Sequence, residues 1–463
     1  MELTGSETTT PPTDAGLLRT GKLSHFLALL MLIHGISYAW VSATKAPNID
    51  FFTFWSVSQA AWTHPVANIY SLEGQRDMAS TAMAAARTST ASDLQRRAAT
   101  IVLGIYDGRI DATGSPLLYA AVGALSSGNF LADQKRFLFV SMLFLVLSVL
   151  LLKRLLHFTS LQAMLLLTFL FLYYEPVVSD LNVGNVNEIQ LLAIVLFIFF
   201  STRSQPMLAG LVIGAVSVFK PTTVLVLALA IGIGVADQDY KRLSRLLVGA
   251  GVAVVALIAA SAAYFGTPDV WLEFVRSLPR TLNTTSYTSE NGNVSLSALF
   301  GGMSGRSSLI AVAFLASLGW LLSVTRKRRR SPVLASSTER NCAMLFHSAF
   351  FAGGCGCAVM LLSSPLAWVH YYLLLLPLTL YLVATPVPNR DADAQTHNFV
   401  AAANRALPFL AFVVLSLLFG QMLSNHLRLL CATIIAATIL TLALAVYRLW
   451  QHRRALNLPD SLA

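Results

Sequence analysis

The sequence is poor in charged residues. Asp, Glu, Lys and Arg together make up 12% of its 463 residues, roughly half the share found in soluble domains. Because 56% of the residues are hydrophobic, too little polar surface is left to cover a folded chain of this length in water. This shortage excludes a soluble enzyme, a disordered protein and a coiled coil, and it predicts a polytopic membrane protein.

Cysteine is also scarce, and the usual cofactor motifs are missing. The four cysteines, Cys342, Cys355, Cys357 and Cys431, lie in apolar stretches without the spacing of a zinc site, so we expect inert buried thiols. The sequence contains no phosphate-binding loop, no dinucleotide-binding glycine motif and no cluster of metal ligands. We therefore expect no cofactor and no metal.

Long apolar runs are abundant, and we expect an all-α protein with about twelve transmembrane helices. Several runs are shorter than the roughly 20 residues that a straight span needs, so some of these helices must be broken, paired or partly buried. The expected segments are 25–44, 137–152, 158–174, 186–201, 206–219, 222–236, 245–265, 307–324, 341–362, 366–385, 405–423 and 426–448.

The distribution of the net charge of +10 indicates which loops lie on the cytoplasmic side of the membrane. With residue 1 in the cytoplasm, basic runs such as 326–330 fall into cytoplasmic loops, as the positive-inside rule requires. The other side then carries equal numbers of basic and acidic residues. The excess charge therefore gives no reason to expect a nucleic-acid partner, and we expect both termini in the cytoplasm.

These spans predict the domain organisation. The apolar piece 115–128 is left over, and we interpret it as a juxtamembrane or re-entrant helix on the outer face. A long external loop, 45–136, then holds this helix and an aromatic segment; such long ordered loops are usually functional. The expected parts are a disordered cytoplasmic N-terminus (1–24), a transmembrane core (25–385), a cytoplasmic loop (386–404), a C-terminal helix pair (405–450) and a cytoplasmic tail (451–463).

Polar residues that suit chemistry gather on the expected outer side. Asp50 follows the first span among aromatic residues, where partial desolvation raises a carboxyl pKa and favours proton abstraction. Asn185, Asn187 and Glu188 crowd the outer end of two apolar segments, and a charge there is costly unless it lines a cavity. The alternatives are an ordinary interfacial Asp and a polar hairpin.

Basic and aromatic residues accompany these acids. Lys220 precedes Pro221 between two short apolar segments, and this lysine could bind a phosphate or simply reach the headgroups. Trp368, His370 and Tyr371 begin a span and could be only an aromatic belt. A last pair, Arg276 and Arg280, shares one helical face and could bind a lipid phosphate or ordinary headgroups.

The order of these motifs resembles that of glycosyltransferase family 87, a polytopic family of the GT-C type that includes polyprenol-phosphate-mannose-dependent mannosyltransferases. The resemblance covers about residues 25–385, although Asn185 stands where members usually have Gln and Ser115 where they usually have Pro. It is carried by Asp50, Ser115-Pro116-Leu117-Leu118-Tyr119, Gly184-Asn185-Val186-Asn187, Lys220-Pro221, Asn293-Val294-Ser295-Leu296, Ser364-Pro365, Trp368 and His370-Tyr371.

The resemblance implies an inverting transfer of a hexose, such as mannose, from a polyprenyl-phosphate donor to a lipid or glycan acceptor. Asp50 would be the general base, in a bacterial plasma membrane protein that works at its outer face. The basic residues would stabilise the leaving phosphate, and the Asn cluster would contact sugar hydroxyls. The alternative is a transporter or flippase of lipid-linked saccharides, for which we would expect internal repeats.

Overall fold

The computed structural model describes residues 15–63, 68–282, 293–299, 338–385 and 427–456, and every secondary-structure element in these ranges is a helix. The protein is thus all-α, as expected. Two of the expected spans, 307–324 and 405–423, and the cytoplasmic loop 386–404 lie outside the described residues.

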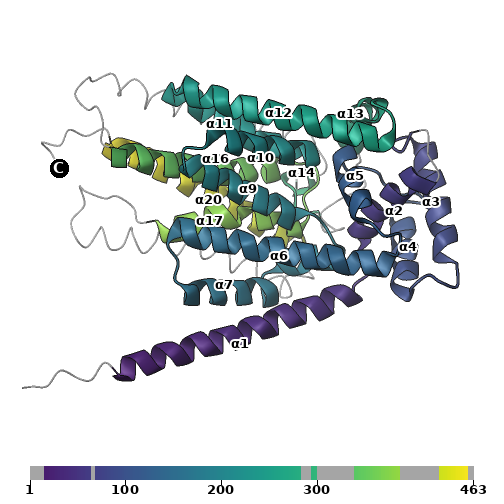
Figure 1. The fold of residues 1–463 in the computed structure, drawn as a ribbon, viewed down its shortest axis with the longest axis horizontal. Coiled ribbons are helices and arrows are strands. Elements are labelled where there is room, and N and C mark those ends of the chain that lie inside the picture. Colours follow the sequence, from purple (N-terminus) through teal and green to yellow (C-terminus); the bar gives the residue numbers. More distant parts are fainter. Residues whose placement is uncertain (1–14, 64–67, 283–292, 300–337, 386–426, 457–463) are drawn as a thin grey trace, which may run out of the picture.

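Five helices are long and apolar enough to cross a membrane. They are α1 (Ala15–Lys45), α6 (Phe130–Leu156), α12 (Tyr240–Phe265), α16 (Thr338–Ser363) and α20 (Leu427–Leu456). Among them, α1 packs against α6 and α16 packs against α20, and α6 and α12 run lengthwise along the molecule in Figure 1. The chain is therefore an integral membrane protein.

The remaining apolar helices are shorter and pack between the long ones. The α10–α11 hairpin is interrupted at Pro221, where one 3-10 turn separates its two arms, and η3 leads directly into α17. These helices are α7 (Ser160–Leu172), α8 (Glu175–Val183), α9 (Asn187–Thr202), α10 (Pro206–Phe219), η1 (Pro221–Thr223), α11 (Val224–Asp237), η3 (Val369–Leu375) and α17 (Leu376–Ala384).

The segment between the first two long helices forms, together with α13 (Asp269–Leu282), a helical cluster at one end of the bundle, on the right in Figure 1. We call it the outer cluster, and its aromatic core includes Phe52, Trp55, Tyr70, Tyr119 and Phe274. Serine side chains cap three of its helices by accepting backbone N–H bonds. Its helices are α2 (Ile49–Thr63), α3 (Leu72–Ala86), α4 (Asp93–Ile105), α5 (Pro116–Leu125) and α13 (Asp269–Leu282).

Helix α5 corresponds to the leftover apolar piece. Its ten residues extend for about 15 Å, which is half of a hydrocarbon core of about 30 Å. It packs against α2, α12 and α10, so it lies where the outer cluster meets the bundle.

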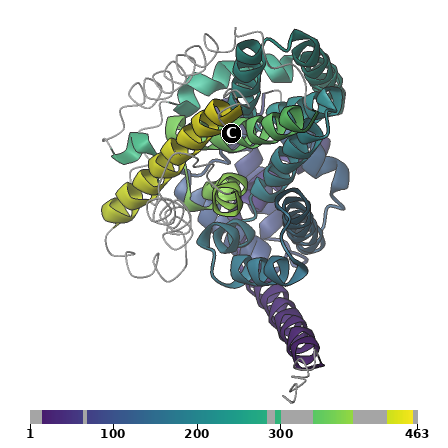
Figure 2. The same ribbon diagram turned by 90° about the vertical axis from the view of Figure 1, so that its left-hand side faces the viewer.

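The ends of the chain lie opposite the outer cluster. Helix α1 begins and α20 ends at the left of Figure 1, and Figure 2 shows α1 diverging from the bundle. Helix α1 begins at Ala15, so the predicted disorder of residues 1–24 is wrong from this residue on. The sequence from Ala15 to Leu23 contains no proline, and its leucines and basic residues favour continuation of the helix. Similarly, α20 continues to Leu456, beyond the expected boundary at 450.

Glycines allow α10 and α12 to pack very closely. A Cβ atom on Gly210 would lie 2.0 Å from the carbonyl oxygen of Leu246, and one on Gly249 would lie 2.2 Å from that of Met207. Small residues at such crossings are typical of helix pairs in membranes, where close backbone contact supplies much of the packing energy. This pair holds the helix that leads to Lys220.

Candidate active site

A polar cluster lies where the outer cluster meets the membrane bundle. It contains residues from four separate parts of the chain, because the start of α2, the α8–α9 turn, the α10–η1 break and η3 converge there. Its members are Asp50, Asp180, Asn185, Asn187, Glu188, Lys220, His370 and Tyr371.

Asn48 fixes the position at which α2 begins. It is fully buried and adopts a left-handed backbone conformation (φ 46°), which Asn tolerates better than most residues. Its side-chain N–H groups donate to the carbonyl oxygens of Leu181 (3.2 Å) and Asn182 (2.7 Å), and its Oδ1 accepts from Gln134 (2.7 Å). The end of α1 is thereby joined to α8 and α6, two residues before Asp50.

Gly184 brings the α8–α9 turn against the start of α2. It ends α8 in the left-handed region (φ 72°), where glycine pays no steric penalty. A Cβ atom here would lie 2.7 Å from Cβ of Phe51 and 3.1 Å from Cβ of Asn48. Only glycine therefore allows the approach that places Asn185 beside Asp50.

Asp50 is the partly open acid of the cluster. Its Oδ2 accepts a 2.6 Å hydrogen bond from Nδ2 of Asn185 and lies 3.9 Å from Nε2 of His370. Its side chain is 27% exposed, whereas that of His370 is 6% exposed. Burial raises the pKa of Asp50 to about 6, and the Asn185 hydrogen bond limits the rise. Such a carboxylate is well suited to accept a proton near neutral pH.

Lys220 is held at the broken end of α10. Pro221 stops the helix, and Nζ of Lys220 donates to Oδ1 of Asn187 at 2.8 Å and to Oδ1 of Asn185 at 3.5 Å. The same Nζ lies 4.3 Å from the ring centroid of Tyr371, a favourable cation–π distance. The ammonium group is thus a single positive charge among several acids.

Two further acids lie behind the lysine. Asp180 and Glu188 are both fully buried. Asn187 donates to Oδ1 of Asp180 at 2.6 Å. No described residue donates a hydrogen bond to the second oxygen of Asp180 or to either oxygen of Glu188. These two carboxyl groups are near enough to hydrogen-bond to each other if one of them is protonated.

Hydrogen bonds from side chains to the backbone hold the η3 segment in place. Oδ1 of Asn293 accepts N–H bonds from Ser295 (3.1 Å) and Ala367 (3.0 Å), and its Nδ2 donates to the carbonyl oxygen of Pro365 (3.1 Å). The hydroxyl of Tyr372 donates to the carbonyl oxygen of Val294 (2.9 Å). The Asn293 motif therefore positions the loop that presents His370.

The structure brings together most of the residues that the sequence singles out, with three exceptions, Arg276, Arg280 and Trp368. Arg276 and Arg280 lie exposed on α13, and Arg280 donates to the carbonyl oxygen of Tyr70 (3.3 Å), a residue of the outer cluster. Trp368 caps the start of η3. Two contributors, Asn48 and Gln134, lay outside the predicted set.

An apolar groove of about 320 Å³ adjoins the cluster. Its wall includes Phe51, Val186 and Phe219, which are the chain neighbours of Asp50, Asn185 and Lys220. Its lining also includes Leu125 and Phe139, whose exposed fractions are 74% and 61%. The groove is therefore lined both by sequence neighbours of the polar cluster and by apolar side chains on the outer surface. It is lined by Phe51, Trp55, Ala121, Val122, Leu125, Ser126, Asp133, Arg136, Phe137, Phe139, Val140, Val186, Ile189 and Phe219.

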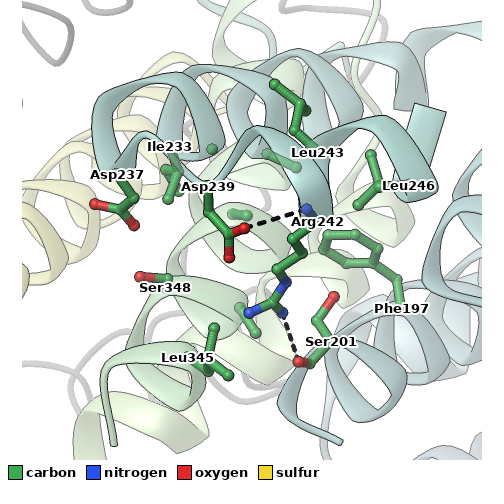
Figure 3. A pocket seen from close by; sticks show the side chains of 14 residues that line it. Phe197, Ser201, Ile233, Asp237, Asp239, Arg242, Leu243, Leu246, Leu345 and Ser348 are labelled. Atoms are coloured by element: carbon green, nitrogen blue, oxygen red, sulfur yellow. Dashed lines mark hydrogen bonds between the residues drawn. The ribbon is translucent and has the colours of Figure 1, made fainter. Parts of the chain in front are cut away.

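A smaller cavity of about 80 Å³ is lined by the last turns of α9 and α11, the first turns of α12 and the middle of α16 (Figure 3). Arg242 donates from its guanidinium to the carbonyl oxygen of Ser201 at 2.6 Å and from its backbone N–H to Asp239 at 3.1 Å. The cavity is well below the roughly 300 Å³ of a typical ligand site. Within the described ranges, no three His, Cys, Asp or Glu side chains are grouped to hold a metal ion.

Comparison with known proteins gives a family match for the central part of the sequence. The sequence model of glycosyltransferase family 87 matches residues 113–349, about half of the chain. The chain is also 28% identical over 217 residues to the polyprenol-phosphate-mannose-dependent alpha-(1-2)-phosphatidylinositol mannoside mannosyltransferase of Mycolicibacterium smegmatis. That alignment covers 47% of this chain and 45% of the relative. No solved structure matches the chain.

Proposed function

Because this chain belongs to glycosyltransferase family 87, we propose that it transfers a hexose from a polyprenyl-phosphate donor to a lipid or glycan acceptor, with Asp50 as the general base. The observation that supports this most directly is the pairing of a partly exposed Asp50 carboxylate with a lysine through Asn185. The reaction needs a base that takes the proton of the acceptor hydroxyl and a cation that stabilises the leaving phosphate.

In the proposed reaction the acceptor hydroxyl gives its proton to Asp50. Asn185 already occupies Oδ2, and no described residue donates to Oδ1, which leaves that oxygen for the acceptor. The acceptor oxygen then attacks the anomeric carbon of the donor sugar from the face opposite the phosphate. The bond between this carbon and the phosphate oxygen breaks, and polyprenyl phosphate leaves with the bonding electrons, which inverts the configuration.

The leaving phosphate gains negative charge as that bond breaks, and Lys220 is the cation available to stabilise it. Its Nζ already lies among two Asn amides and the Tyr371 ring, so little reorganisation is needed. Stabilisation of developing charge by groups already in position is often the largest contribution to catalysis. His370, 3.9 Å from Asp50, is the second group that we assign to the phosphate or to the proton.

The apolar groove is the place that we assign to the hydrocarbon chain of the donor. Its wall includes Phe51, Val186 and Phe219, each of which is adjacent in sequence to a residue of the polar cluster. Its volume of about 320 Å³ is at the lower end of ligand sites, so only the first part of a long chain fits. The rest would lie in the bilayer beyond Leu125 and Phe139, and the exposed Arg276 and Arg280 would bind lipid phosphates at the surface.

We propose mannose as the sugar and a glycolipid as the acceptor, because the mycobacterial relative is named for mannose and for a phosphatidylinositol mannoside. The polar cluster would then lie at the extracytoplasmic face of a bacterial plasma membrane, with both termini in the cytoplasm. Asn185, which is buried but hydrogen-bonded to the partly exposed Asp50, would contact sugar hydroxyls. Asn187 is fully buried and would support it from behind.

Replacement of Asp50 by Asn tests this function. We expect Asp50→Asn to reduce transfer of labelled mannose from polyprenyl-phosphate-mannose to membrane glycolipids by about 100-fold or more, because general bases contribute that much or more to rate. Transfer is measured with purified protein in lipid vesicles. The matched control is Asp77→Asn, which removes the same charge from an exposed position on α3.

Full transfer by a folded Asp50→Asn protein would rule out Asp50 as the base. Movement of the lipid-linked sugar across the vesicle membrane without a glycosidic product would show a flippase instead.

A further inference from the structure

The acids behind Lys220 have no part in the proposed reaction, yet they are the most deeply buried charges of the cluster. Asp180 and Glu188 have no exposed surface, and apart from each other no described residue forms a hydrogen bond with three of their four oxygens. Buried carboxylates are normally compensated completely, because an uncompensated one is very costly. The arrangement therefore requires an explanation.

The two Asn residues of the α8–α9 turn connect the lysine to an acid on each side. Asn185 joins Asp50 to Lys220, with contacts of 2.6 and 3.5 Å. Asn187 joins Asp180 to Lys220, with contacts of 2.6 and 2.8 Å. The ammonium group of Lys220 thus lies between two carboxyl groups, and the side-chain amide of one Asn connects it to each of them by hydrogen bonds.

Charge balance limits how many of these acids are ionised. The titratable groups that face Lys220 from the described elements are Asp50 on α2, Asp180 on α8, Glu188 on α9, and His370 and Tyr371 on η3. If all three acids were ionised, one ammonium would face three negative charges in a buried space. Two adjacent carboxyl groups avoid this by sharing one proton, as paired acids in enzymes do.

The hydrogen bonding shows which acid holds the proton. Asp180 already accepts from Asn187, and the hydrogen bond from Glu188 favours its ionised form, although burial still raises the pKa of Asp180 above its ordinary value. Both oxygens of Glu188 lack a donor, so Glu188 is the one that donates. A neutral Glu188 also suits its place at the start of an apolar helix.

We propose that Glu188 is a permanently protonated carboxylic acid whose hydrogen bond holds Asp180 ionised, and that Asp180 is the fixed counter-charge that keeps Lys220 positively charged and in place. Both are positioning residues. This assigns Glu188 a role different from the sugar contact expected from the sequence. The part that concerns Lys220 and the donor phosphate rests on the proposed function.

Two substitutions separate this proposal from an ionised Glu188. Glu188→Gln keeps a neutral donor of the same shape, so we expect kcat/KM within about threefold of wild type and an unchanged pH profile. Asp180→Asn removes the counter-charge, so Lys220 should lose its proton at lower pH. We expect the alkaline limb of kcat/KM to move down by about one pH unit.

A loss of activity of about 100-fold in Glu188→Gln, or an unchanged alkaline limb in Asp180→Asn, would overturn the proposal.

The protonation of Glu188 has a readout that needs no transfer activity. Infrared difference spectra at pH 8 should contain the C=O band of a protonated carboxyl group in wild type and lack it in Glu188→Gln. At this pH, Asp50 and Glu175, whose pKa values are raised to about 6 and about 7, are mostly ionised. In Asp180→Asn the band should remain but shift, because the acceptor of its hydrogen bond has changed.

The matched control for the spectra is Glu175→Gln, which should remove no such band. If the band persists in Glu188→Gln, Glu188 is not the protonated acid, whatever reaction the protein catalyses. If wild type shows the band but transfers no sugar, the proposed transferase function is wrong, whereas the proton shared by Asp180 and Glu188 is still supported.

Discussion

At the scale of single residues, the cluster depends on side chains that balance one another. Asp50 is a usable base because two effects on its pKa oppose each other. Burial raises the pKa, and the 2.6 Å bond from Asn185 stabilises the ionised form. Asn185 therefore has an electrostatic role in addition to any contact with sugar, and this role can be measured.

We expect transfer to depend on an ionised Asp50. Because its pKa is raised to about 6, kcat/KM should fall about tenfold for each pH unit below 6. Asn185→Ala removes a bond that stabilises the carboxylate, so the acid limb should move upward by about one pH unit. The measurement is the pH dependence of mannose transfer, and an acid limb that stays in place would show that Asn185 does not influence Asp50.

Which site residues could be predicted from the sequence depended on their surroundings. Asp50, Asn185, Lys220 and His370 stand out because polar residues are rare beside apolar segments. Asn48 and Gln134 do not stand out, because their importance comes from a contact between α1, α6 and α8 that joins residues far apart in the chain. Glu188 was noticed, but only its burial and its unpaired oxygens indicate that it carries a proton.

At the scale of helices, apolar segment length was a reliable guide to where helices occur but not to their ends. Pro221 was expected to interrupt a hairpin, and the structure has a 3-10 turn there. The start of α1 at Ala15 was missed, because a polar helical turn outside an apolar run has the same composition as a disordered tail. Close approaches such as that of α10 and α12 were also not predicted, since glycine is common in apolar helices whether or not it lies at a helix–helix contact.

The α10–α12 contact offers a stability test with an internal control. Gly249→Val would force its side chain against the backbone of Met207, and we expect a destabilisation of about 2 kcal/mol or more. Gly251→Val lies on the same helix, but a Cβ atom there meets nothing within 4 Å, so it should be nearly neutral. Thermal unfolding of the two purified variants compares them, and equal melting temperatures would contradict the close packing.

At the scale of the whole molecule, the structure separates two ends. The outer cluster and the polar cluster lie at one end, and α1 begins and α20 ends at the other. The topology predicted from the sequence assigns the basic excess of +10 to the side of the termini. The proposal places the end with the polar cluster at the extracytoplasmic face and the end with the termini in the cytoplasm.

Labelling of single cysteines tests this orientation. Asp107→Cys, beside α4, should react in intact cells with a reagent that does not cross membranes, whereas Lys241→Cys, at the start of α12, should react only after permeabilisation. Both positions are exposed. The native Cys355, Cys357 and Cys431 are buried, and unmodified protein measures any background from native cysteines. Labelling of both positions from the same side would refute the topology.

The apolar groove opens beside α5 and α6, where Leu125 and Phe139 are exposed. A donor that enters there is dissolved in the bilayer and not in water. The concentration that controls the rate is then the fraction of lipid molecules that are donor, whatever the volume of the sample. Adding inert lipid or detergent to a fixed amount of donor would slow the enzyme by surface dilution, so its affinity is meaningful only as a mole fraction.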